Sequence, residues 1–66
     1  MQITVNGQKK TISDEMTIKD LLIQLKIEQK TMASAVNMEV VKKEQWQNYR
    51  LKEGDKVEFL HFVGGG

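Results

Sequence analysis

The fold depends most on the C-terminal stretch KVEFLHFV, residues 56–63, which runs directly into Gly64-Gly65-Gly66. Valine and phenylalanine favour extended backbone, so this stretch predicts a strand. It is the most hydrophobic strand that the sequence predicts, and a strand at the centre of a sheet is the one with the most surface to bury. We therefore place it at the centre of the sheet, next to the N-terminal strand.

Side chains of this strand alternate between the two faces of the sheet. Val57 and Phe59 share one face, while Glu58, Leu60 and Phe62 share the other. A glutamate is a poor core residue, so we expect Val57 and Phe59 to lie beneath the helix. Leu60 and Phe62 then lie on the open face, where clustered apolar side chains often mark a partner surface. The alternative is that loops cover them.

The N-terminal segment predicts a hairpin. Residues 1–5 alternate between apolar and polar side chains, as in a half-buried strand. Asn6-Gly7 follows, and this pair suits a two-residue turn that needs positive φ at both positions. Residues 8–12 return as a second strand. Its lysines favour a position at the edge of the sheet.

One amphipathic helix follows the hairpin. Thr17 is a suitable N-cap, and Asp20 stands at the third helical position, as in a capping box. We expect the helix to end near Lys26. Its apolar stripe, which we assign to core packing, consists of Ile18, Leu21, Leu22 and Leu25.

The remaining segments are short. Strands are predicted within residues 32–37 and at 40–41, a helical turn at 44–46, and a turn at 52–55. Trp46 is expected to pack at the edge of the core. The element order is thus β-β-α-β-β-β. It predicts an α+β fold in which a mixed sheet of four to five strands grasps one main helix.

Composition excludes several classes of function. The chain has 66 residues, which is one small domain with no room for a deep catalytic cleft. It contains no cysteine, which fits a reducing cytoplasm, and no segment that could be a signal peptide or membrane span. The formal net charge of +1 argues against nucleic acid as a partner.

The sequence offers no catalytic or metal-binding constellation. His61 is the single histidine, and its neighbours do not form a motif of a general base or a metal ligand. The acidic residues are scattered and match no metal-binding loop. We therefore expect neither a catalytic residue nor a bound metal or cofactor.

The glycine tail is the remaining candidate for function. A tail without side chains can enter a narrow cleft, where another protein can do chemistry on the terminal carboxyl group. By itself, however, Gly64-Gly65-Gly66 is more typical of a frayed terminus or a linker.

Taken in order, several segments resemble the ThiS family of ubiquitin-like sulfur carriers, and the resemblance covers essentially the whole chain. No single segment is specific, but their order and the chain length together are. The segments are Ile3-Thr4-Val5-Asn6-Gly7, Thr17-Ile18-Lys19-Asp20-Leu21-Leu22, Ala35-Val36-Asn37-Met38-Glu39-Val40-Val41, Trp46, Leu51-Lys52-Glu53-Gly54-Asp55-Lys56-Val57-Glu58 and Val63-Gly64-Gly65-Gly66.

The resemblance implies a β-grasp domain over residues 1–63 and a flexible glycine tail over residues 64–66. It implies that an E1-like adenylyltransferase of the ThiF type uses ATP and Mg²⁺ to adenylate Gly66. The adenylate is converted to a thiocarboxylate, with sulfur from a donor such as a cysteine desulfurase relay. Thiazole synthase, of the ThiG type, then takes the sulfur for the thiazole of thiamine.

By the same resemblance, Gly64 and Gly65 thread the tail into the enzyme. We assign the partner interface to Leu60 and Phe62 of the open face together with Val63. The chain would be a sulfur-carrying co-substrate rather than an enzyme, with neither nucleic acid nor membrane as a partner. We expect it to be cytoplasmic and monomeric when free.

Two positions depart from the family pattern. The family often has Asn-Gly where this chain has Asn37-Met38, and Pro-Arg where it has Lys42-Lys43. Methionine tolerates positive φ poorly, so the first departure predicts an altered hairpin turn. Neither departure touches the tail.

Three other functions remain open at this point. The small subunit of molybdopterin synthase uses the same terminal chemistry, although that family is usually longer. A ubiquitin-like modifier would join Gly66 to a lysine through an isopeptide bond. A β-grasp interaction module would carry its glycines without using them.

Overall fold

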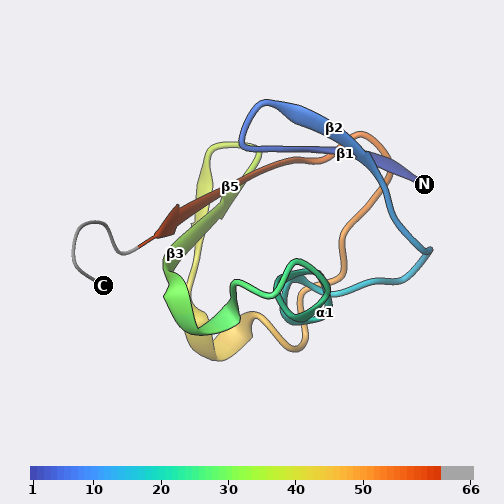
Figure 1. The fold of residues 1–66 in the computed structure, drawn as a ribbon. Helices are drawn as coiled ribbons and strands as arrows, with labels where there is room; N and C mark the ends of the chain where they lie inside the picture. The colour runs from blue at the N-terminus through green and yellow to red at the C-terminus, as the bar shows by residue number, and fades with distance from the viewer. Residues whose placement is uncertain (62–66) are drawn as a thin grey trace.

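The computed structural model describes residues 1–61. These residues form a five-stranded mixed sheet in the order β2-β1-β5-β3-β4, with one α-helix packed across one of its faces (Figure 1). The strands are β1 (Gln2–Val5), β2 (Gln8–Thr11), β3 (Thr31–Val36), β4 (Glu39–Val41) and β5 (Lys56–His61). The helix is α1 (Ile18–Gln24), and two short 3-10 helices, η1 (Glu28–Lys30) and η2 (Lys43–Gln45), lie in the connections.

Strand β5 occupies the centre of the sheet, as its hydrophobicity predicts. It runs parallel to β1, with Thr4 opposite Lys56 and Val5 opposite Val57. On its other side it pairs antiparallel with β3. The predicted order of strands and helix and the α+β class are confirmed. The last predicted strand continued to Val63, which lies outside the described residues.

Helix α1 begins at the predicted cap. The backbone N–H of Asp20 donates to Thr17 Oγ1 at 3.1 Å, and the N–H of Thr17 donates to Asp20 Oδ2 at 3.2 Å. These reciprocal bonds form a capping box, which satisfies two donors that the first turn leaves without a partner inside the helix.

The helix ends two residues before Lys26. Lys26 has a φ of 61°, and its N–H donates to Ile23 O, while the N–H of Ile27 donates to Leu22 O. This pair of bonds is the Schellman arrangement, usually built on glycine. The reversal turns the chain back towards β3 and lets one short helix cover the sheet.

The core lies between α1 and the sheet. Ile18, Leu21 and Leu22 of the helix are fully buried, in agreement with the predicted stripe. The placement of Trp46 at the edge of the core is wrong, because Trp46 is only 3% exposed. Helix η2 folds the indole inward, and its Nε1–H donates to Val41 O at 2.9 Å. That bond satisfies the buried polar atom.

The β3–β4 turn keeps its geometry despite Met38. Asn37 and Met38 have φ values of 51° and 72°, close to the left-handed values of 47° and 83° at Asn6 and Gly7. The prediction of an altered turn is wrong. Asn37 explains why, because its side chain donates to Asp55 Oδ1 and accepts from the N–H of Lys56, both at 3.0 Å.

The two hairpin turns provide a matched test of backbone strain. Met38 is 85% exposed, so Met38→Gly removes strain at positive φ without removing packing. We expect this change to raise the free energy of unfolding by roughly 0.5–1 kcal/mol. Gly7→Met should lower it by roughly 1 kcal/mol, since an added Cβ meets open space and the cost is conformational.

Urea unfolding followed by the fluorescence of Trp46, the single tryptophan, measures both variants. If Met38→Gly proves neutral or destabilising, then positive φ at this position is not a source of strain.

Candidate functional site

Strand β5 presents its side chains to two environments. Val57 is fully buried and Phe59 is 6% exposed, and both belong to the core that α1 covers. Leu60 is 60% exposed on the opposite, open face, where Glu58 is also exposed. The predicted assignment of these four side chains to the two faces is confirmed.

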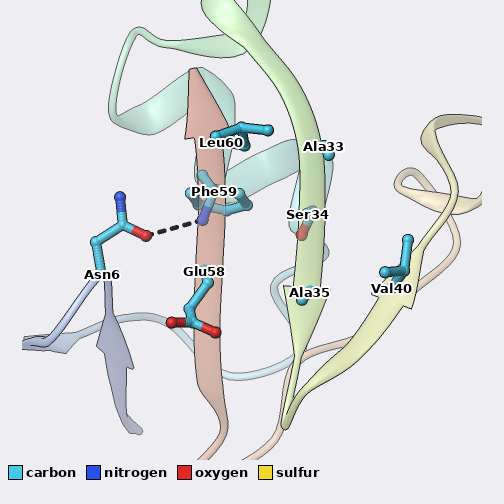
Figure 2. A pocket seen from close by; sticks show the side chains of 8 residues that line it. All are labelled: Asn6, Ala33, Ser34, Ala35, Val40, Glu58, Phe59 and Leu60. Carbon is cyan, nitrogen blue, oxygen red and sulfur yellow. Dashed lines mark hydrogen bonds between the residues drawn. The ribbon is translucent and has the colours of Figure 1, made fainter.

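An apolar groove runs over the open face, between β5, β3 and β4. Ala33 lies opposite Leu60, and Ala35 lies between Glu58 on one side and Val40 on the other. The groove has a volume of about 320 Å³. It is hollow because β3 carries two alanines where larger side chains would fill the space between its neighbours. The lining residues, drawn in Figure 2, are Asn6, Ala33, Ser34, Ala35, Val40, Glu58, Phe59 and Leu60.

The other half of the open face is polar. Lys9 of β2 lies opposite Thr4 of β1, which lies opposite Lys56 at the start of β5. Residues opposite one another in register share a face, so both lysines border the open face beside Glu58. Exposed apolar groups therefore gather beside the C-terminal half of β5, and charged groups gather beside its N-terminal half.

The structure describes only part of the predicted site. Leu60 lines the groove and is exposed on the open face, as predicted, while its role in a partner interface stays a prediction. The other predicted interface residues, Phe62 and Val63, lie outside the described residues. So do Gly64, Gly65 and Gly66, the predicted site of chemistry.

His61 takes an ordinary structural position at the end of β5. Its Nδ1 lies 3.4 Å from Thr31 Oγ1, and this hydroxyl donates to Ile27 O at 2.8 Å. Within residues 1–61, no group of three His, Cys, Asp or Glu side chains is arranged to hold a metal ion.

Sequence reasoning missed five groove residues: Asn6, Ala33, Ser34, Ala35 and Val40. Alternation along β3 could have placed the two alanines on the open face, because Val36 and Ser34 face the core. Asn6 carries no such signal. Its Oδ1 accepts a hydrogen bond from the N–H of Phe59 at 2.8 Å, across 53 residues of sequence.

The geometry of the groove does not identify a protein family, whereas the sequence does. The sequence profile of the ThiS family matches residues 3–66, which is nearly the whole chain. The chain belongs to the ThiS family. It is 37% identical to the sulfur carrier protein ThiS of Bacillus subtilis, over 97% of this chain and 98% of that one. A thiazole synthase of Paramagnetospirillum magneticum is 33% identical over all 66 residues, and the chain spans about a fifth of the length of that protein.

The fold is also that of the ThiS family. The crystal structure of a thiamine biosynthesis protein (ThiS) from Geobacter metallireducens matches with a TM-score of 0.83 and 38% identity. The match covers 100% of both chains. The predicted β-grasp fold is confirmed. In residues 1–61, no helix has the length and the apolar character needed to cross a membrane.

The two faces of β5 predict opposite effects on stability for two adjacent truncations. Phe59→Ala should lower the free energy of unfolding by about 3–5 kcal/mol, because it leaves a cavity in the core. Leu60→Ala should change it by less than about 1 kcal/mol, because the side chain is mostly exposed. Urea unfolding of the two variants measures the difference. A cost at Leu60 as large as that at Phe59 would contradict the open face.

Proposed function

We propose that this chain carries sulfur for formation of the thiazole of thiamine, on the carboxyl group of Gly66. The single observation that carries the proposal is membership of the ThiS family across nearly the whole chain, including the glycine tail. A relative of the same length bears the name of sulfur carrier. A small domain with an exposed apolar groove suits a substrate that enzymes recognise.

The chemistry at Gly66 accounts for a tail of glycines. A carboxylate is a poor electrophile, so it must first be joined to a leaving group. One carboxylate oxygen attacks the α-phosphorus of ATP, the bond to the β-phosphate breaks, and pyrophosphate leaves. The terminal sulfur of a persulfide on the donor then adds to the carbonyl carbon of the adenylate, and AMP departs, which leaves an acyl disulfide. A thiol attacks the donor's sulfur in this disulfide, so the S–S bond breaks, a new disulfide forms on the donor side and the thiocarboxylate is released. Glycine offers no side chain to obstruct these steps.

The proposed partners are the enzymes that perform these steps. An E1-like adenylyltransferase supplies the ATP site, with Mg²⁺ bound to the phosphates, and a relay such as a cysteine desulfurase supplies sulfur. Thiazole synthase accepts the sulfur. The alignment of the full chain with a fifth of a thiazole synthase supports this last partner, because a segment similar to this chain then lies in the same polypeptide as that enzyme. We place these reactions in the cytoplasm, with the free carrier as a monomer.

The apolar groove is the proposed recognition surface for these enzymes. Leu60 and Val40 are exposed at 60% and 77%, and burying them against a partner is favourable. Glu58 and Lys56 beside the groove can fix the orientation of the partner, since polar groups at a rim contribute specificity. Leu60 also lies six residues before Gly66, so contact with the groove brings the tail close to the enzyme.

Intact-protein mass spectrometry tests the tail. Incubation with ATP, Mg²⁺, the E1-like enzyme and a sulfur source should replace one terminal oxygen by sulfur. Deletion of Gly66 should abolish that mass change, while the urea unfolding curve stays that of the full chain. An unchanged mass for the full chain, with an enzyme shown to be active on another carrier, would argue decisively against the proposed function.

Charge placed in the groove tests recognition. Leu60→Asp should lower kcat/KM for adenylation by about tenfold or more, because the interface would bury a carboxylate without a partner. Ile23→Asp is the matched control, since Ile23 is 52% exposed on α1, away from the groove. It should leave kcat/KM within about twofold. Equal losses in the two variants would mean that the groove is not the recognition surface.

A further inference from the structure

Strand β5 extends beyond the end of β1, the strand that pairs with one of its two edges. The pairing of β1 with β5 ends at Val5 opposite Val57, but β5 continues to His61. Figure 1 shows β5 running on past the turn that joins β1 to β2. The C-terminal part of β5 therefore has β3 on one side and, among residues 1–61, no strand on the other.

The direction of the main-chain groups follows from the bonds already formed. The N–H groups of Thr4 and Asn6 donate to the carbonyls of Asp55 and Val57, at 3.0 and 2.9 Å. The N–H and C=O groups of odd-numbered residues of β5 thus point towards β1. The N–H and C=O groups of even-numbered residues point towards β3, as the hydrogen bond from the Asn37 N–H to Lys56 O shows. Because these directions alternate along a strand, the N–H and C=O groups of Phe59 and His61 point to the side of β5 where β1 has already ended.

Asn6 occupies the first position beyond the end of β1. Its Oδ1 accepts from the N–H of Phe59 at 2.8 Å, so a side chain extends the ladder by one hydrogen bond (Figure 2). The turn at Asn6-Gly7 then leads the chain away into β2. The carbonyl of Phe59 and the N–H of His61 are the next groups in the ladder, and no residue of β1 lies opposite them.

We propose that this edge of β5, from Phe59 to His61, pairs with an extended strand of the enzyme that acts on Gly66. The proposal rests on the proposed function and adds how the enzyme sets the register of the tail. Addition of a strand to a free sheet edge is a common mode of recognition, with affinity from main-chain hydrogen bonds.

The sequence of the tail explains why main-chain contacts are needed. Gly64-Gly65-Gly66 has no side chains, so an enzyme can locate Gly66 along its channel only through backbone groups and steric fit. A ladder that starts at His61 begins five residues before the terminal carboxyl group. A slip by one residue in such a ladder would break its hydrogen bonds, so the ladder fixes where the carboxyl group lies.

The position of this edge also favours the enzyme over a second copy of the chain. The edge adjoins the groove, because Asn6, Phe59 and Leu60 line that groove. A partner in the groove therefore already lies beside the edge. The outer edge at β2 is long enough to pair, but it carries Lys9 and Lys10.

Two substitutions at His61 separate the effect of losing the main-chain N–H from the effect of losing the side chain. His61→Pro removes the N–H and His61→Ala keeps it, while both remove the imidazole. Proline is tolerated where the N–H faces away from a strand partner. We expect the kcat/KM for pyrophosphate release from ATP by the E1-like enzyme to be about tenfold lower for His61→Pro than for His61→Ala. Equal values for the two variants would overturn the strand pairing.

Amide hydrogen exchange tests the same bond in the unsubstituted chain, without any effect of proline on folding. Adding the E1-like enzyme should slow exchange at the His61 amide by about tenfold or more. The Phe59 amide is the internal control, because it already donates to Asn6 and should slow much less. Unchanged exchange at His61 in the bound chain overturns the pairing. If the unsubstituted chain does not bind the E1-like enzyme and that enzyme releases no pyrophosphate from ATP in its presence, the proposed function itself fails.

Discussion

The parallel pairing of β5 with β1 is the contact on which the rest of the structure depends. It joins Thr4 and Val5 to Lys56 and Val57, near opposite ends of the chain, and so closes the sheet around α1. Val57 becomes fully buried at the centre of the core. Closing so long a loop costs entropy, which the apolar surface buried by the helix and the central strand offsets. The described end of β5, at His61, is thereby held in the sheet by the pairing of β5 with β1 and β3.

The same pairing separates stability from recognition within one strand. Phe59 and Leu60 are neighbours, yet Phe59 packs in the core and Leu60 lies in the groove. Ala33 and Ala35 of β3 likewise combine two roles. Their small side chains leave the groove open, and their backbones pair with β5 in the sheet. A partner can therefore bind the open face without disturbing the core. That arrangement suits a protein whose chemistry is proposed to take place in the active sites of other proteins.

Sequence reasoning succeeded where the deciding interactions are local. The capping box at Thr17 and Asp20 spans three residues, and the two faces of β5 follow from strand alternation. It failed where distant segments contribute. Trp46 was placed at the edge of the core as the default for a large aromatic residue, whereas packing against the helix and the sheet buries it to 3% exposure. The turn at Met38 was expected to change, but the contacts of Asn37 with Asp55 and Lys56 maintain it.

The sequence by itself determined the β-grasp order of elements, the helix boundaries to within two residues, the exposure of Leu60 and the glycine tail that points to sulfur-carrier chemistry. These features depend on periodicity, caps and motif order, which are all readable along the chain. Only the tertiary structure decided the groove and the free edge of β5. The groove needs the register of three strands, and the edge is defined by where β1 stops and Asn6 reaches Phe59, 53 residues away. No local pattern encodes that distance, because it results from how the whole sheet closes.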